Sequence, residues 1–334
     1  MSDADRPTLE LFWGHVTNNS ARIYARIPLE QAKSAEARLS GQVTGPLCES
    51  SRTLPASLPL RFLGSDPTPL ACAEVPDPTF WSPELPALYR VDVEVTAGHG
   101  LRNVETRWLG LKRFGAKGPS WFNDGRRAVI RAAQCSIGEV NRELAAEWLE
   151  SRMSPLLVVD RFDPSLSDYL EGAARWGLPL LIALTSRSSE CVNTVRQLAQ
   201  SPFQAATTML LIPSDAISEA DADAVRKVRG NLPLVACLPV DTISIAGDPC
   251  EARSTNQGSH THRADWADAW LIDESAAETF RDPARPVMIY RHTETSFTGA
   301  AEPRRECERL QRDCTHAGDF AGYVIGHWLQ NNRD

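Results

Sequence analysis

The sequence predicts two domains of different type, an antiparallel β-sandwich followed by a small TIM (β/α)8 barrel. Residues 8–115 contain about seven short, often alternating segments separated by polar, glycine or proline breaks, which is typical of a sandwich. Residues 128–330 contain apolar runs at fairly even spacing with helix-like stretches between most of them. About 200 residues is the lower size limit of such a barrel. We therefore expect a sandwich over residues 1–117 and a barrel over residues 118–334.

The strand pattern of the sandwich is clearest in "LYRVDVEV", residues 88–95. Its polar residues Arg90, Asp92 and Glu94 alternate, so one face of this strand is expected to contact water. The segments expected to form the sandwich are "LELFWGHV", "ARIYARI", "AEARLSGQV", "LPLRFLG", "LACAEVP", "LYRVDVEV" and "VETRWLGLKRF".

The apolar runs of the second half mostly do not alternate, which suits parallel strands buried on both faces. The helix-like segments between them begin near serine caps and end at glycine, as "SLSDYLEGAARWG" does at Gly177 and "SEADADAVRKVRG" does at Gly230. An open doubly wound sheet is the alternative, although no glycine-rich phosphate turn follows a strand. The expected barrel strands are 128–133, 156–160, 178–185, 207–214, 232–241, 269–274, 286–292 and 322–328.

The composition argues against several classes of protein. The chain is 42% hydrophobic and 23% charged, and its net charge of -8 disfavours a nucleic acid partner. Its longest apolar runs are too short to span a bilayer, so no membrane partner is expected. The first residues lack the basic and apolar regions of a signal peptide, and the cysteines are scattered without a C-x-x-C pair. We therefore expect a cytoplasmic protein.

Four segments resemble glycoside hydrolase family 2, the group of β-galactosidases, β-mannosidases and β-glucuronidases. "TFWSPELPALYRVDVEV" (79–95) is similar to the W-S-P-x-x-P-x-L-Y signature in the immunoglobulin-like sandwich of that family. "GLKRFGAKGPSWFNDGRRAVIRAA" (110–133) resembles the crossing into its barrel. "DYLEGAARWGLPLLIAL" (168–184) and "FAGYVIGHWLQNN" (320–332) resemble its third and last strands.

The resemblance implies an immunoglobulin-like sandwich followed by a degenerate TIM barrel. Family members usually begin with a jelly-roll domain, whereas this chain starts directly at the sandwich, so the resemblance implies a divergent, truncated member. The family's second strand carries a histidine where this chain has Phe162.

The resemblance also identifies the positions of the two catalytic carboxylates. The family has its acid/base glutamate at the end of the fourth strand and its nucleophilic glutamate at the end of the seventh. Asp215 and Arg291 take those positions here. An arginine is always protonated and cannot act as the nucleophile. If Asp215 lies opposite Arg291, the pair would hold Asp215 ionised, so that it would be a poor general acid.

We therefore expect a catalytically inactive protein with a carbohydrate-binding or scaffolding role. The first alternative is an active glycosidase with relocated carboxylates, in which Asp215 acts with Glu274 or Asp273. The second alternative is a protein-interaction module. The simpler interpretation of strand-end carboxylates, including Asp163 and Glu294, is that they cap helices or form salt bridges.

Several strand-end residues are candidates for contacting a sugar, and Trp328 could form an apolar platform for its ring. The long polar loop after the fifth strand contains His260 and His262 near Asp265, but H-x-H in a loop does not direct both imidazoles at one metal. We expect no metal and no cofactor, since the sequence has no P-loop, dinucleotide fingerprint or G-x-S-x-G. The candidates for sugar contact are Asp160, Ser214, Asp241, His292, His327 and Trp328.

Overall fold

The computed structural model describes residues 9–27, 37–96, 102–136, 138, 140–238 and 264–329. The chain forms two compact units. The first extends to Lys112 and also includes Ala174–Gly177 and Gln200–Ala205; the second begins at Arg113. None of the described helices is both long and apolar enough to cross a membrane.

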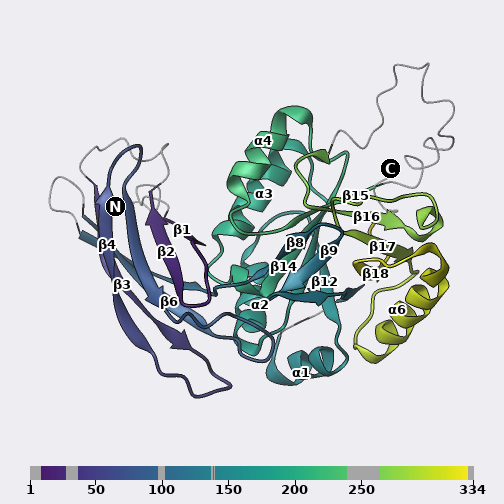
Figure 1. Cartoon of the computed structure of the whole chain (residues 1–334), viewed down its shortest axis with the longest axis horizontal. Helices are drawn as coiled ribbons and strands as arrows, with labels where there is room; N and C mark the ends of the chain where they lie inside the picture. Colours follow the sequence, from purple (N-terminus) through teal and green to yellow (C-terminus); the bar gives the residue numbers. More distant parts are fainter. Residues whose placement is uncertain are drawn as a thin grey trace. The chain divides into compact units, whose positions relative to one another are not determined.

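The first unit is an immunoglobulin-like β-sandwich, which confirms the fold class predicted for this part of the chain (Figure 1). Its strands are antiparallel and lie in the order β1-β2-β5-β4-β3-β6-β7. The first part of β4 pairs with β3 and its last part pairs with β5, so β4 joins the two layers. The strands are β1 (Glu10–Gly14), β2 (Ser20–Arg26), β3 (Arg38–Leu47), β4 (Ala56–Gly64), β5 (Leu70–Pro76), β6 (Leu88–Thr96) and β7 (Arg102–Leu109).

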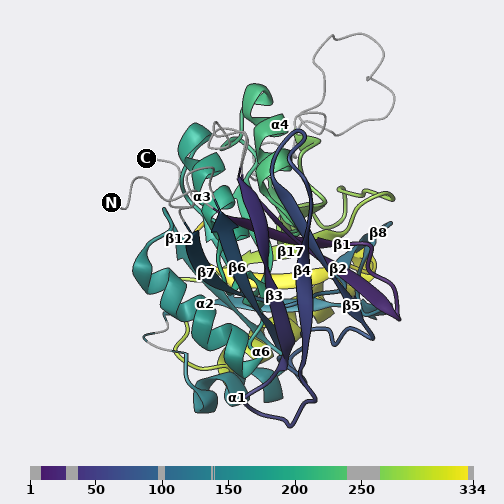
Figure 2. The same ribbon diagram turned by 90° about the vertical axis from the view of Figure 1, so that its left-hand side faces the viewer.

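The core of the sandwich follows from strand alternation. In β6, Val91 and Val93 are fully buried, whereas Asp92 between them is partly exposed, as the sequence predicts. Burying each valine stabilises the fold by roughly 1.5–3 kcal/mol. Figure 2 shows β3 beside β6, and the two strands pair closely because Gly41 has no side chain. A Cβ at Gly41 would lie 1.9 Å from the backbone oxygen of Asp92.

A small antiparallel sheet spans the predicted boundary between residues 117 and 118, in a stretch that the sequence indicates only as the crossing into the barrel. It consists of β8 (Phe114–Lys117), β9 (Ser120–Asn123) and β10 (Arg126–Ala128). Asp124 and Gly125 both have positive φ, which suits the tight turn between β9 and β10. Trp121 on β9 is fully buried in the barrel core and stacks on Phe114 with ring centroids 5.2 Å apart. This sheet therefore belongs to the second unit.

The second unit contains a closed barrel of eight parallel strands, which confirms the predicted TIM-like barrel and excludes the open sheet. The barrel closes where β18 pairs with β11. The strands are β11 (Ile130–Gln134), β12 (Ser154–Val159), β13 (Leu180–Leu184), β14 (Thr207–Pro213), β15 (Leu234–Cys237), β16 (Ala269–Asp273), β17 (Val287–His292) and β18 (Gly322–Gly326).

Helices follow several of these strands at the predicted places (Figure 1). Between β16 and β17 lies the short 3-10 segment η4, rather than a full α-helix. The helices are α1 (Arg142–Glu150), α2 (Pro164–Trp176), α3 (Ser188–Gln200), α4 (Glu219–Val228) and α6 (Ala301–Asp313), and the 3-10 segments are η2 (Gln204–Ala206), η4 (Glu274–Ala276) and η5 (Thr315–Ala317).

The barrel interior is filled by small and medium apolar side chains from alternate positions of each strand. Among them are Leu156, Ala183 and Leu271, together with the larger Tyr290. Because strand side chains alternate, the residue two positions beyond each core residue also points inward, toward the carboxyl end of the barrel. This rule identifies the residues that form the inner rim of the barrel mouth.

Candidate functional site

The candidate site is the mouth of the barrel at the carboxyl ends of its strands. Strand alternation directs five polar side chains inward there. Two are carboxylates, two are neutral hydrogen-bonding groups and one is an imidazole. They are Gln134, Asp160, Thr185, Asp273 and His292, at the ends of β11, β12, β13, β16 and β17.

Arg291 does not belong to this inner row. It lies between Tyr290 and His292 on β17, and its guanidinium points to the outer side of the strand. Its Nε lies 3.0 and 2.9 Å from the two carboxylate oxygens of Glu274, and its Nη2 lies 2.8 Å from Asp313 Oδ2 on α6. These bonds, chiefly the one to Glu274, raise the pKa of the guanidinium above its ordinary value.

Arg291 and Asp215 do not pair with each other, because each has a different partner. Asp215 lies in the turn after β14 and accepts a hydrogen bond of 2.9 Å from Arg187 Nη1. Both side chains of this pair are about half exposed, at 49% for Arg187 and 52% for Asp215. Ser214, the residue before Asp215, donates its backbone N–H to Cys237 O. The predicted acid/base position is therefore an ion pair on the solvent-exposed rim.

The two alternative nucleophiles, Asp273 and Glu274, lie on opposite sides of the barrel wall. Glu274 binds Arg291 on the outer side. Asp273 is on the inner side, where its Oδ1 accepts bonds from Ser275 N at 2.9 Å and from Ser275 Oγ at 2.6 Å, capping η4. Burial raises the pKa of the Tyr290 hydroxyl, and the charge of Asp273 contributes to this increase. Asp273 and Tyr290 are paired in register on the adjacent strands β16 and β17.

The strand-end carboxylates after β12 have structural partners. Thr185 Oγ1 donates to Asp160 Oδ1 at 3.4 Å, at an exposed position. Asp163 accepts from Ser165 Oγ at 2.6 Å and from Leu166 N at 2.9 Å, at the start of α2. These hydrogen bonds lower the pKa of Asp163, as expected for a helix-capping carboxylate. Glu294, after β17, is exposed.

Gln134 is a site residue that sequence reasoning missed. It is only 7% exposed, and its amide holds His327 at two points. Gln134 Oε1 accepts a hydrogen bond of 2.8 Å from the backbone N–H of His327, and Gln134 Nε2 lies 3.1 Å from His327 Nε2. The only signal in the sequence was that the strand "IRAAQ" ends in an amide side chain, directly after two alanines.

Trp328 lies inside the barrel rather than on an open face. It is 2% exposed and packs edge-to-face against Tyr290, with ring centroids 6.3 Å apart. The Tyr290 hydroxyl donates to the backbone oxygen of Gly326 at 2.5 Å. A Cβ at Gly326 would lie 2.8 Å from Gln134 Cβ and 3.5 Å from Trp328 Cδ1, so this glycine permits the close packing of the cluster.

His292 ends β17 in register with Gly326, which brings it to the same part of the mouth as His327. Asp241, His260 and His262 lie outside the described residues. Within the part of the chain that the structure describes, no group of three or more His, Cys, Asp or Glu side chains is arranged to hold a metal ion.

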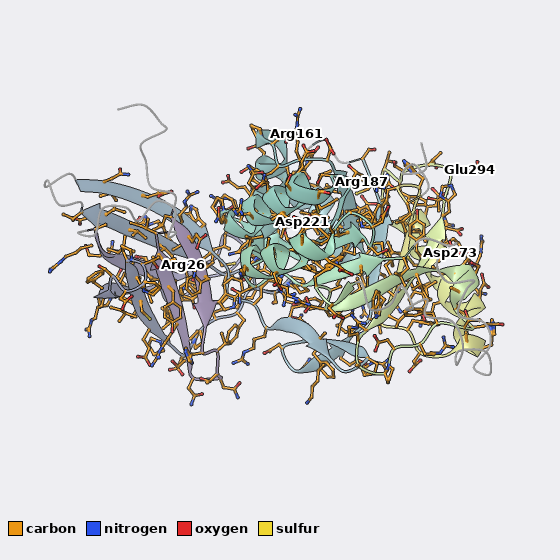
Figure 3. All side chains as sticks on the ribbon, turned by 90° about the horizontal axis from the view of Figure 1, so that it is seen from above. Arg26, Arg161, Arg187, Asp221, Asp273 and Glu294 are labelled. Carbon is orange, nitrogen blue, oxygen red and sulfur yellow. The ribbon has the colours of Figure 1, made fainter. Side chains whose placement is uncertain are left out.

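Figure 3 labels two residues of the mouth, Arg187 from the loop after β13 and Asp273 at the end of β16. A general acid requires a carboxyl group whose pKa is raised toward the working pH. Among the described carboxyl groups, a clear pKa shift is found for Asp163 and Asp282, and in both the pKa is lowered.

Comparison with known proteins finds a similarity of sequence in the first unit and a similarity of fold over both units. Residues 14–112, which form most of the sandwich, match the sequence model for Glycosyl hydrolases family 2. The search among curated proteins found no match. Solved structures of this fold are similar to the chain over nearly its whole length, with low sequence identity.

A Bacteroides uniformis β-glucuronidase has 12% identity and a TM-score of 0.56, over 95% of this chain and 45% of that chain. A glycosyl hydrolase family 2 member from Bacteroides cellulosilyticus has 11% identity and a TM-score of 0.59, over 96% of this chain and 43% of that one. A Ruminococcus gnavus β-glucuronidase has 9% identity and a TM-score of 0.58, over 95% of this chain and 60% of that chain.

The chain thus spans less than two thirds of the length of these structures. At these identities the structural similarity establishes the fold alone, while the family model rests on the sequence of the sandwich. The sandwich is thus similar in sequence to glycosyl hydrolases family 2, and the two units have the fold of these solved enzyme structures.

Proposed function

We propose that this chain is a non-hydrolytic relative of glycosyl hydrolases family 2 that binds a carbohydrate at the carboxyl-terminal mouth of its barrel. The observation that carries the proposal is the outward ion pair between Arg291 and Glu274. Retaining hydrolysis requires two carboxyl groups about 5–5.5 Å apart, and inverting hydrolysis requires about 6.5–9.5 Å. The ion pair commits Glu274 to the outer side of the barrel, where it cannot supply one of them.

The other candidate carboxylates also have structural partners. Asp215 is paired with Arg187, and Asp273 caps η4. A catalytic carboxylate must face the glycosidic bond, whereas these contacts hold Asp215 on the exposed rim and tie Asp273 to Ser275. These contacts favour an inactive protein over an active glycosidase with relocated carboxylates.

The carbohydrate ligand is inferred from the side chains at the mouth and from the fold. Asp160 and Asp273 can accept hydrogen bonds from sugar hydroxyl groups, and Gln134 with the nearby histidines provides further polar atoms. The β-glucuronidases among the similar structures are enzymes that act on sugars, which supports a sugar as the ligand class.

The test is a hydrolysis assay with p-nitrophenyl β-galactoside, β-mannoside and β-glucuronide, from acidic to neutral pH, with sugar binding measured in parallel by isothermal titration calorimetry. We expect nitrophenol release no faster than from the doubly substituted control Asp215→Asn/Asp273→Asn. We also expect saturable binding of at least one glycoside. Hydrolysis by the wild-type chain that either single substitution abolishes would contradict the proposal. Binding of a protein partner without any sugar binding would support the interaction-module alternative.

A further inference from the structure

The contact between Gln134 and His327 determines which ring nitrogen of His327 carries a proton. Gln134 Oε1 accepts from the backbone N–H of His327, so the other end of the amide is the NH2 group, which donates. That NH2 group lies 3.1 Å from His327 Nε2, so Nε2 must be the acceptor. A neutral imidazole has one donor and one acceptor nitrogen. In the neutral ring, this contact therefore places the proton of His327 on Nδ1.

His327 Nδ1 is then a buried N–H donor, and it has no acceptor within the described part of the chain. His292 Nδ1, on the adjacent strand β17, is also buried and lacks a described partner. Buried polar groups in native proteins usually have hydrogen-bond partners. The indole Nε1 of Trp328 is likewise unpaired, but so are those of Trp121 and Trp148 in other places, so the inference rests on the two histidines.

The charges around this cluster indicate what sort of ligand would satisfy it. The inner rim carries the carboxylates Asp160 and Asp273, which would repel an anion. Arg291 is turned outward to Glu274, and Arg187 is paired with Asp215. A buried carboxylate ligand requires a cationic partner to offset its lost hydration. A neutral polyhydroxylated ligand can accept from an imidazole N–H and donate to a carboxylate.

We propose that Gln134 is a positioning residue that orients His327 and places the proton of its neutral imidazole on Nδ1. We propose further that His327 and His292 bind the oxygen atoms of a neutral polyhydroxylated ligand at the ends of β11, β17 and β18. The ligand part of this inference rests on the proposed carbohydrate function, whereas the tautomer part does not depend on it.

The tautomer is tested by NMR of the full chain labelled with 15N-histidine, at a pH where the rings are neutral. The variants His327→Gln and His292→Gln assign their signals among the seven histidines. We expect His327 to be protonated on Nδ1 in the wild type. In Gln134→Glu, a carboxylate would accept from Nε2–H, so the proton should move to Nε2. The matched control is Gln311→Glu, because Gln311 binds Arg131 instead. Finding wild-type His327 protonated on Nε2 would overturn the assignment.

The ligand class is tested with p-nitrophenyl β-galactoside, which is neutral, against p-nitrophenyl β-glucuronide, which is anionic. We expect the neutral glycoside to shift the His327 and His292 signals saturably, and the glucuronide to bind at least about tenfold more weakly. We expect Gln134→Leu to weaken binding of the neutral glycoside by about tenfold. The proton of His327 should then no longer be confined to Nδ1.

Two outcomes would overturn the ligand assignment alone. One is equal or tighter binding of the glucuronide, and the other is saturable sugar binding that leaves both histidine signals unmoved. Failure of every glycoside to bind, by NMR and by calorimetry, would overturn the ligand assignment and the proposed carbohydrate function together. The tautomer assignment would still be decided by the 15N-histidine NMR measurement alone.

Discussion

The guanidinium of Arg291 lies against the carboxylate of Glu274, with Nε 2.9 Å and Nη2 2.5 Å from Oε2. The two residues come from the ends of adjacent strands, and Asp313 on α6 joins them as a second acceptor. Arg291 is 18% exposed, so the pair is partly shielded from water. The contact ties β17 to η4 and α6 on the outer side of the barrel, which explains why a cation is found so near the expected position of a nucleophile.

The first prediction concerns Arg291→Glu, which places a glutamate at the position identified from the family resemblance. The new carboxylate would face Glu274 and Asp313, so we expect no hydrolysis. We also expect a loss of about 2–4 kcal/mol in the free energy of unfolding, because two carboxylates lose their cation and gain a like charge. Urea denaturation and the nitrophenyl glycoside assay measure these effects, with Arg291→Met as the uncharged control. Hydrolysis gained by Arg291→Glu would show that this side chain can reach the interior.

The second prediction concerns Gly326→Ala in β18. The added Cβ would lie 2.8 Å from Gln134 Cβ, so Gln134 must move and its contact with His327 is lost. We expect a destabilisation of about 1–3 kcal/mol, as for other overpacked cores. The matched control is Gly115→Ala, because a Cβ at Gly115 meets nothing within 4 Å. Equal stability of the two variants would contradict the packing described for the mouth.

The third prediction concerns the pH dependence of stability through Asp282. This carboxylate accepts from Trp270 Nε1 at 2.7 Å and from Arg285 Nε at 2.8 Å. Burial alone would raise the pKa of Asp282, but these hydrogen bonds outweigh it and lower the pKa below its ordinary value. The unfolded chain therefore takes up the proton at a higher pH than the folded chain does. The stabilisation is complete above about pH 4 and is lost as the pH falls through the folded-state pKa.

We accordingly expect Asp282→Asn to lower the free energy of unfolding by about 2 kcal/mol at neutral pH. The difference from wild type should shrink as the pH falls below about 4. Urea unfolding over a series of pH values measures it. The control is Asp223→Asn, whose carboxylate is 77% exposed in its pair with Arg226 and should have little effect. A difference that stays constant down to acid pH would contradict the assignment.

The fourth prediction concerns the thiols of Cys135, Cys191 and Cys307. Burial raises the pKa of each to about 12, so almost no reactive thiolate is present at mildly alkaline pH. We expect these three to resist iodoacetamide in the native protein and to react after unfolding in urea. Peptide mass spectrometry identifies the labelled sites, with the partly exposed Cys48 as the reactive control. Rapid native labelling of Cys135 would show that the end of β11 is open to solvent.

The order of strands and helices follows from the chain's own hydrophobic pattern. Alternation predicted β6 and its wet face, and the continuous apolar runs predicted the barrel strands, because each signal depends on neighbours along the chain. The small sheet β8–β10 was not predicted, since its strands have only three or four residues and its one buried anchor, Trp121, packs into the distant barrel.

Only the folded barrel shows in which direction each side chain at the mouth points. A shift of one position along a strand moves a residue from the inner face to the outer one. The family resemblance therefore placed Arg291 at the end of its strand but did not give the side on which the arginine lies. Gln134 and His327 are 193 positions apart, and only closure of the barrel between β11 and β18 brings them together. Local patterning establishes which segments become strands, while register and ring closure establish which polar groups meet, because those contacts join residues that no sequence window contains.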